Sequence, residues 1–188
     1  MRGYGTAFRK LRSELSAHGA PRFLIRAAER AARDEIRHAR MARALARRHG
    51  GVWRAPIVTD TAPRDVEAIA TENAVEGCVR ETFGAVLATW QARAAKDASI
   101  RATMERIARD ETRHAVLAHN VDAWIIKKLD RTARGRVQRA RQLAFEGLVT
   151  TCGELDCKTR AALGLPTGSE TRQLATRMAA ARSRPATA

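Results

Sequence analysis

The chain has 188 residues and a formal net charge of +15, and 30 of its 35 basic residues are arginine. This length suits one domain with a full hydrophobic core. No stretch is long and apolar enough for a membrane span or a signal peptide, so we expect a cytoplasmic protein. Cys78, Cys152 and Cys157 are not spaced as a zinc or redox pair, which favours reduced structural thiols.

Apolar residues recur at helical spacing and strand-like alternation is absent, so the sequence predicts an all-α fold. Glycine and proline punctuation predicts helices over about residues 3–17, 21–48, 63–95 and 97–128, with Asp97 as an N-cap, then a fifth from about residue 131 and short pieces around GLPTGS. Two short loops and one long crossover indicate an antiparallel four-helix bundle over residues 1–129. Residues 130–188 form a basic helical extension with a frayed tail.

A six-residue motif occurs twice, as RDEIRH at 33–38 and RDETRH at 109–114. Its Glu and His fall on the apolar seam of both predicted helices. The seams are Leu24, Ala28, Ala31, Glu35, His38, Ala42, Leu45 and Ile100, Met104, Ile107, Glu111, His114, Ala118, Val121, Ile125. A buried carboxylate is costly unless it is paired or bound to metal, and Glu-x-x-His lets both side chains reach one ion. Two antiparallel copies therefore predict a site for two ions bridged by carboxylates.

Asp34 and Asp110 precede the two Glu residues of the repeat. Each could accept the second N–H of the imidazole on the opposite helix, which fixes the tautomer and raises the basicity of the ligand. Arg37 and Arg113 are then charges on the solvent side or just outside the ligands.

Carboxylates also interrupt the seam of the third predicted helix, which passes through Glu72 and Glu76. Glu76 is the stronger metal-ligand candidate, and Glu72 and Glu81 are the less favoured alternatives. At 100° per residue Glu81 points about 140° away from Glu76. It belongs instead to a ridge of small residues, Ala70, Ala74, Gly77, Gly84 and Ala88. We expect the fifth helix or a second subunit to pack there, with Glu81 facing an arginine.

The basic residues gather toward the two ends of the chain: residues 1–50 carry 13 basic and 4 acidic side chains, and residues 130–188 carry 11 and 5. A row on the second predicted helix, opposite its seam, consists of Arg26, Arg30, Arg33, Arg37, Arg40 and Arg47. The phosphates of a nucleic acid would offset the repulsion within this row. A solvated face, with the arginine excess of a GC-rich genome, is the alternative.

The segments ERAARDEIRHARM, ENAVEGCVRET and RIARDETRHAVLA resemble the ferritin-like di-iron carboxylate superfamily, which includes bacterioferritin, rubrerythrin and a ferritin-like tRNA hydroxylase. Within this superfamily, the sequence resembles specifically a group of ferritin-like domain proteins common in myxobacteria. The resemblance covers about residues 6–128. It implies that two iron or manganese ions react with dioxygen or peroxide, and that their ligands are Glu35, His38, Glu76, Glu111 and His114.

The family pattern also requires a Glu from the first helix. The seam through Tyr4 and Phe8 places this ligand near Met1, where the chain has none. Either the natural chain begins upstream of Met1 or the ligand has been lost. Glu14 is off the seam and too close to the following turn, so we expect it to be a solvated charge.

The leading hypothesis is a di-iron or di-manganese oxidoreductase that activates dioxygen or peroxide, provided that the missing ligand is supplied. Its substrate is not predicted, and a homodimer is compatible with the pattern. The alternative is a ferritin-like scaffold whose incomplete or vestigial metal site has no catalytic role. Such a scaffold would bind nucleic acid or protein through its basic surface.

Overall fold

The structure is a computed structural model that describes residues 5–52, 64–150 and 157–182. These residues are almost entirely helical and contain no strand, so the predicted all-α class is confirmed for them. Within the same ranges, no helix combines the length and apolar character needed to cross a membrane.

The helices follow the predicted order with small shifts at their ends. They are α1 Thr6–Ala17, α2 Arg22–Arg48, α3 Val66–Glu72, the π-helix η1 Asn73–Glu81, α4 Thr82–Ala94, α5 Ala98–Ile125, the 3₁₀ turn η2 Ile126–Lys128, α6 Arg131–Thr150, α7 Cys157–Leu163 and α8 Gly168–Arg182. Asp97 caps α5 as expected, because its side chain accepts from the backbone N–H groups of Ser99 and Ile100. The crossover residues 53–63 lie outside the described residues.

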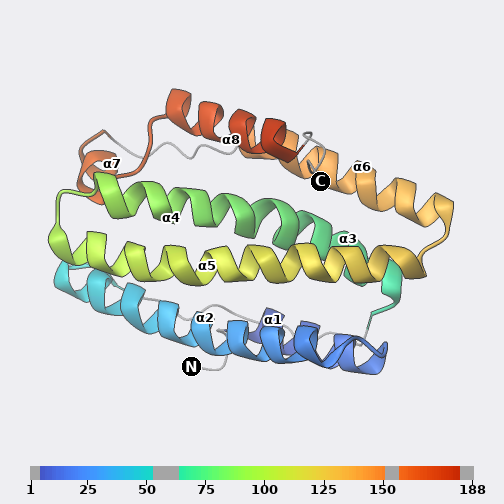
Figure 1. Ribbon diagram of the computed structural model, residues 1–188. Helices are drawn as coiled ribbons and strands as arrows, with labels where there is room; N and C mark the ends of the chain where they lie inside the picture. Colours follow the sequence, from blue (N-terminus) through green and yellow to red (C-terminus); the bar gives the residue numbers. More distant parts are fainter. Residues whose placement is uncertain (1–4, 53–63, 151–156, 183–188) are drawn as a thin grey trace.

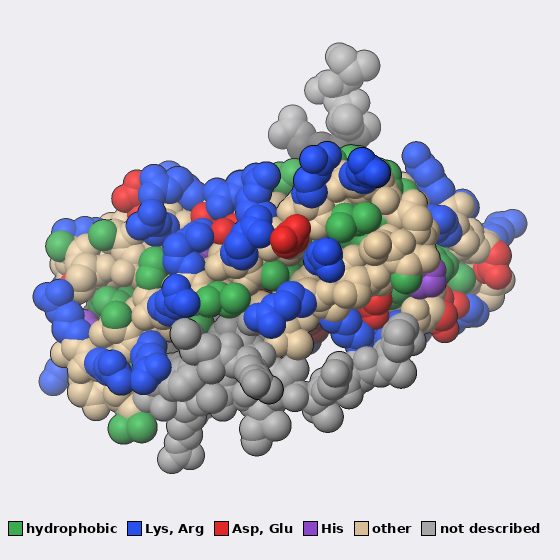
Figure 2. Space-filling view, turned by 90° about the horizontal axis from the view of Figure 1, so that it is seen from below, with side chains coloured by type: hydrophobic (Ala, Val, Ile, Leu, Met, Phe, Trp, Pro, Cys, Tyr) green, Lys and Arg blue, Asp and Glu red, His purple; other side chains and the backbone are tan. Residues whose placement is uncertain are grey.

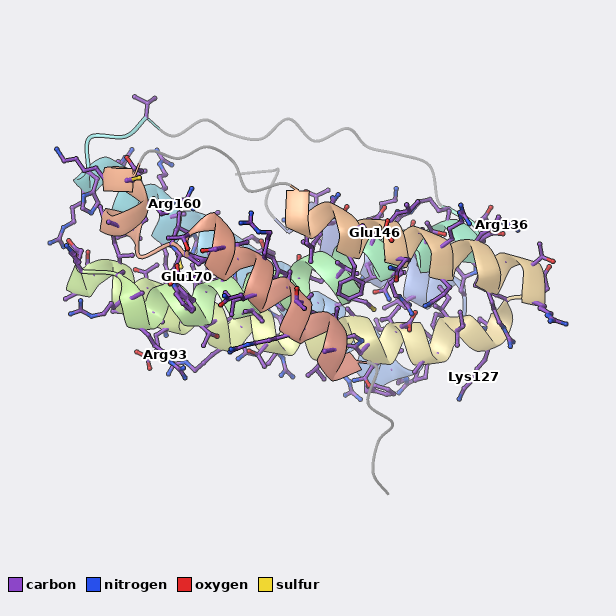
Figure 3. The ribbon with its side chains drawn as sticks, turned by 90° about the horizontal axis from the view of Figure 1, so that it is seen from above. Arg93, Lys127, Arg136, Glu146, Arg160 and Glu170 are labelled. Atoms are coloured by element: carbon purple, nitrogen blue, oxygen red, sulfur yellow. The ribbon has the colours of Figure 1, made fainter. Side chains whose placement is uncertain are left out.

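Helix α5 lies in the middle of the molecule (Figure 1). The α1–α2 pair covers one side of it, and the continuous run of α3, η1 and α4 covers the other. Helices α6 and α8 form an outer layer over that run, and α8 crosses above α4 in the view from above (Figure 3). The two copies of the repeated motif, on α2 and α5, thus belong to neighbouring helices.

The core is built largely from alanine and aliphatic side chains on the predicted seams. Leu15 of α1, Leu24 and Ala28 of α2, and Leu117 and Val121 of α5 form one buried cluster. Fully burying a leucine or valine contributes about 1.5–3 kcal/mol. Alanine between these larger residues lets the helix backbones approach closely, which brings the polar side chains of the repeat into contact across the α2–α5 interface.

The helical run from Val66 to Ala94 contains a π-helix, which the sequence did not predict. In a π-helix each N–H bonds to the carbonyl five residues earlier, so each residue advances the chain by a smaller rotation than in an α-helix. The angle of about 140° predicted between Glu76 and Glu81 at 100° per residue is therefore wrong here. As a result Glu81 faces α5.

Ion pairing holds helix α6 against the rest of the structure. Arg136 of α6 donates to both carboxylate oxygens of Glu67 at 2.6 and 2.7 Å. The start of α8 has a capping box in which Thr167 and Glu170 each accept from the other's backbone N–H. Whether residues 130–188 form a separate unit stays a prediction.

The described cysteines form no disulfide. Cys78 is buried in η1, and Cys157 is exposed at the start of α7. Cys152 lies outside the described residues.

Gly77 of η1 packs directly against α5. A Cβ at this position would lie 2.7 Å from Cβ of Ala118 and 3.0 Å from Oδ1 of Asn73. Gly77→Ala should therefore lower the free energy of unfolding by about 1–3 kcal/mol. At Gly84 an added Cβ meets nothing within 4 Å, so Gly84→Ala should be neutral or stabilising by up to about 1 kcal/mol. Urea denaturation of both variants tests this contrast, and equal effects would contradict the close η1–α5 contact.

Candidate metal centre

His38 of α2 contacts carboxylates from both helices of the repeat. Its Nδ1 atom lies 3.1 Å from Oε1 of Glu35 and 3.2 Å from Oε1 of Glu111. Its Nε2 atom lies 3.0 Å from Oδ2 of Asp110. One ring nitrogen therefore faces two glutamates, while the other is held by an aspartate on the opposite helix.

His114 of α5 has the matching arrangement and is 2% exposed. Its Nδ1 atom lies 3.4 Å from Oε2 of Glu111, 3.6 Å from Oε2 of Glu81 and 3.7 Å from Oε1 of Glu35. Its Nε2 atom lies 3.4 Å from Oδ2 of Asp34. Among the described residues, neither ring nitrogen has a hydrogen-bond partner. A buried imidazole in this condition is costly in free energy and calls for an explanation.

The two aspartates are fixed by two arginines. Arg37 of α2 donates to Oδ1 of Asp34 at 2.7 Å and also bonds to Asp110. Arg113 of α5 lies 3.2 Å from Oδ2 of Asp34 and also bonds to Asp110. Both carboxylates are 6% exposed, so each buried negative charge has cationic partners from both helices. Arg37 is thus turned toward the α2–α5 interface and does not extend the solvated arginine row.

Two overlapping groups of side chains within the described residues could hold a metal ion. One consists of Glu35, His38 and Glu111, and the other of Glu81, Glu111 and His114. The ligand atoms in each group lie within 4.8 Å of one another. Glu111 belongs to both groups and directs one oxygen toward each imidazole. This is the geometry expected of a carboxylate placed between two cations.

The third helical run contributes Glu81, and neither Glu76 nor Glu72 belongs to either group. The carboxylate of Glu76 is 50% exposed and accepts from Arg80 at 2.5 Å. Glu72 is 48% exposed and pairs with Arg64. Glu81 faces His114 rather than the arginine that we expected. The sequence signal that could have indicated Glu81 is its spacing of four residues from Gly77, which packs against Ala118 of α5.

Helix α1 supplies an aromatic ring rather than a described acid to this centre. The ring of Phe8 lies 4.8 Å from the ring of His114, centroid to centroid. Glu14 is 3% exposed and accepts from Arg64 at 2.7 and 2.8 Å, so the expectation of a solvated charge was wrong. The error arose because Arg64 reaches Glu14 from a distant part of the chain. Met1 and Tyr4 lie outside the described residues.

The carboxylates around the imidazoles strongly affect protonation. Burial by itself lowers the pKa of both imidazoles, but the neighbouring carboxylates, foremost Glu111, raise the pKa of His38 to about 10 and that of His114 to about 9. Burial raises the pKa of Glu81 to about 7. At Glu111 burial also acts to raise the pKa, but contacts with the two imidazoles outweigh it and hold the pKa far below its ordinary value. Without metal, both imidazoles are therefore cationic at neutral pH.

The fold and this cluster together define an all-helical protein with a buried carboxylate–histidine site. Comparisons of the chain with protein-family models, with curated proteins and with solved structures find no match.

The choice between Glu81 and Glu76 can be tested by matched substitutions on the same helical run. We expect Glu81→Gln to weaken the binding of one metal ion by at least about tenfold. Mutation of a residue that only orients a metal ligand already lowers metal affinity by about 10- to 100-fold. Glu76→Gln should leave binding unchanged, because its carboxylate pairs with Arg80. Titration calorimetry with Mn²⁺ would measure both. A larger effect at Glu76 would show that the third helical run is wrongly phased.

Proposed function

We propose that this protein is a ferritin-like carboxylate oxidoreductase that holds two iron or manganese ions at the Glu35–His38–Glu111 and Glu81–Glu111–His114 groups. The observation that carries the proposal is His114: it is buried, neither of its nitrogens has a hydrogen-bond partner among the described residues, and carboxylates surround it. A cation at this position would satisfy the imidazole and the carboxylates together.

The donor set fits the proposed metals. Each group offers one imidazole nitrogen and oxygens from two glutamates, and no described thiol belongs to either group. Imidazole suits iron as well as zinc, copper and nickel, and carboxylate suits manganese, whereas thiolate-rich sites favour iron–sulfur clusters. Bound iron or manganese would supply the redox equivalents for reduction of dioxygen or peroxide.

The surrounding residues have distinct roles under this proposal. Asp110 orients the imidazole of His38 through a hydrogen bond to Nε2, and Asp34 lies 3.4 Å from Nε2 of His114, so that each Nδ1 faces the glutamates. Arg37 and Arg113 keep both aspartates ionised and in position. The acids that orient the ring nitrogens are thereby separated from those that would bind metal.

A small cavity leads to this centre and limits what can reach it. It has a volume of about 70 Å³ and is lined by Phe8, Gly77, Glu81 and His114, among others. This volume exceeds the roughly 10–15 Å³ that one water molecule requires, so the cavity can hold small molecules. Dioxygen or peroxide fits this space. An organic substrate would require the surrounding side chains to move.

Metal analysis of the purified full-length chain tests the proposal. After reconstitution with Fe²⁺ or Mn²⁺ and removal of excess ions, we expect roughly two ions per chain. The reduced iron form should then consume dioxygen. A chain that retains neither iron nor manganese would contradict the metal centre, whereas a loaded chain inert to dioxygen and peroxide would contradict only the oxidoreductase activity.

A second candidate function is binding of nucleic acid, and the surface around α2 favours it. Figure 2 views the molecule from the side of α1 and α2 and shows Lys and Arg side chains spread over this face with few acids among them. Arg26, Arg30 and Arg40 are exposed, and no ion pair holds them in the described part of the chain. Free guanidinium groups at helical spacing suit phosphates.

The salt dependence of nucleic-acid binding tests this second function. Binding of a nucleic-acid duplex should weaken steeply with salt, and reversing the charge of Arg26, Arg30 and Arg40 should reduce the slope. Glu29→Lys, which adds a cation on the same helix, should strengthen binding. The absence of binding at low salt would exclude a nucleic-acid role for this surface.

A further inference from the structure

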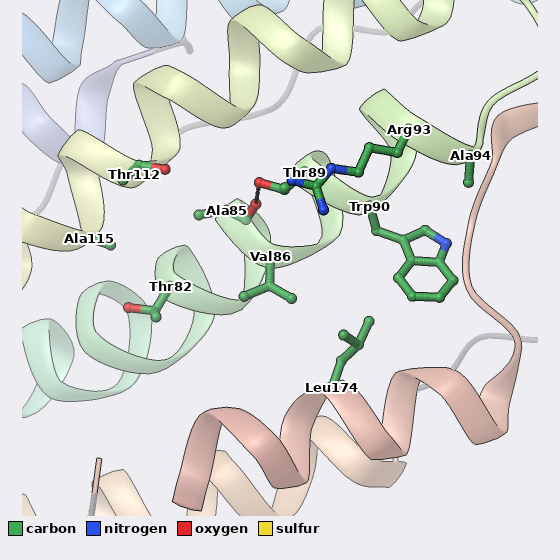
Figure 4. A pocket seen from close by; sticks show the side chains of 10 residues that line it. All are labelled: Thr82, Ala85, Val86, Thr89, Trp90, Arg93, Ala94, Thr112, Ala115 and Leu174. Atoms are coloured by element: carbon green, nitrogen blue, oxygen red, sulfur yellow. Dashed lines mark hydrogen bonds between the residues drawn. The ribbon is translucent and has the colours of Figure 1, made fainter. Parts of the chain in front are cut away.

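A second and larger cavity lies along α4, between α5 and α8 (Figure 4). Its volume is about 650 Å³. Small-molecule sites commonly enclose about 300–1,000 Å³. Val86 and Trp90 of α4, Ala115 of α5 and Leu174 of α8 form apolar parts of its wall. No metal-centre residue lines it, so it is a separate space.

The composition of α4 indicates that its surface at this cavity is normally in contact with another molecule or element. No charged residue occurs from Thr82 to Ala92, so α4 is apolar or neutral on every face over three turns. A helix of this kind is normally buried on all sides. Helix α5 covers one face and α8 lies over another, and the cavity is the part of the α4 surface that neither of them fills.

One cation stands at the edge of the apolar wall. Arg93 lines the cavity, and its guanidinium extends back along α4 toward Thr89 (Figure 4). No acidic side chain is among the lining residues, and Arg93 forms no ion pair within the described ranges. The hydroxyl oxygen of Thr82, another lining residue, is buried and has no hydrogen-bond partner in the part of the chain that the structure describes. An unpaired guanidinium beside an apolar wall complements a molecule with a hydrocarbon body and an anionic end.

We propose that this cavity binds an amphipathic organic carboxylate. The hydrocarbon part lies against Val86, Trp90 and Leu174, and the carboxylate pairs with Arg93. This inference goes beyond the proposed function and does not depend on it, because binding here requires no metal. A second copy of the chain suits the wall less well. A symmetric interface must be self-complementary, and this one offers a cation without an acid.

Calorimetric titration of the full chain with dodecanoate, below its critical micelle concentration, tests the proposal. We expect saturable binding with a negative heat-capacity change, the signature of apolar burial. Arg93→Leu should weaken dodecanoate at least about tenfold, whereas Arg93→Lys, which keeps the charge, should weaken it less. Arg22→Leu is the matched control, because Arg22 is exposed at the start of α2 and does not line the cavity, and should leave affinity unchanged.

A neutral probe and a cavity-filling variant distinguish the contribution of the apolar wall from that of the Arg93 guanidinium. Dodecanol should bind wild type at least about tenfold more weakly than dodecanoate, and should be insensitive to Arg93→Leu. Val86→Trp should abolish binding of both probes in a chain whose circular dichroism is unchanged. Equal affinity for dodecanoate and dodecanol, or no effect of Arg93→Leu, would overturn the proposal. Self-association through this face without dodecanoate binding would assign it to a second copy and would also overturn it.

Discussion

Glu111→Gln is expected to abolish tight metal binding in both halves of the centre. Glu111 is the residue that the two groups share, with Oε1 3.2 Å from Nδ1 of His38 and Oε2 3.4 Å from Nδ1 of His114. Gln keeps the shape of the side chain but removes its charge, so each cation loses one anionic ligand. Loss of an orienting residue alone reduces affinity about 10- to 100-fold, and loss of a shared ligand should exceed that for each ion. Inductively coupled plasma mass spectrometry after desalting would measure the retained iron or manganese.

Glu105→Gln is the matched control for this change. Glu105 lies on the same helix, is 66% exposed and pairs with Arg109, so its variant should retain the wild-type metal content. The fold of metal-free Glu111→Gln must be checked separately by circular dichroism, because removing one partner of a buried ionic cluster destabilises the protein. A folded Glu111→Gln protein that still holds two ions would refute the assignment of this residue.

The stability of the metal-free protein is expected to fall as the pH rises from about 6.5 toward 9–10, where the imidazoles of His114 and His38 titrate. Their pKa values are raised above the ordinary value of 6.5, so in this range the native state binds more protons than the unfolded state. Stability then decreases with increasing pH. The contribution is fully present below pH 6.5 and is lost as the pH passes through the native pKa values.

Bound metal should reverse this dependence. A metal ion needs neutral imidazole, so binding must displace the protons held by His38 and His114 below pH 9. Apparent affinity should rise about tenfold per pH unit for each displaced proton. The stabilisation by metal therefore grows over the same range in which the metal-free protein weakens.

Urea denaturation of the metal-free and Mn²⁺-loaded chains at several pH values measures both slopes. Glu111→Gln should flatten the dependence of the metal-free protein, because it removes the carboxylate that contributes most to raising both pKa values. A metal-free protein whose stability is constant or increases between pH 6.5 and 9 would show that the imidazoles are not held in their protonated form.

Much of the candidate site could be predicted from the sequence alone, because helical periodicity depends on residues that are close together in the chain. The spacing of Glu35 and His38, and of Glu111 and His114, places each pair one turn apart on its own helix. Their positions on apolar seams indicated burial, and the structure brings the four together across the α2–α5 interface. The repeat also indicated that each aspartate would reach the imidazole on the opposite helix, because the two copies of the motif face each other in an antiparallel pair of helices.

Other features depended on contacts that spacing does not encode. Constant rotation of 100° per residue favoured Glu76, but the π-helix Asn73–Glu81 changes the phase and presents Glu81 instead. Glu14 is buried only because Arg64 pairs with it. Similarly, Arg37 turns inward because Asp34 and Asp110 lie together.

The sequence by itself thus determined the all-α class and most of the seams of α2 and α5, on which His38 and His114 are buried. The tertiary structure decided which glutamate of the third run joins them, which charges are neutralised by pairing, and where the α4 surface remains open. The physical reason is that helix formation and amphipathicity depend on near neighbours in the chain. Helix phase after a π segment, and the partner of a buried charge, depend instead on residues brought together only by folding.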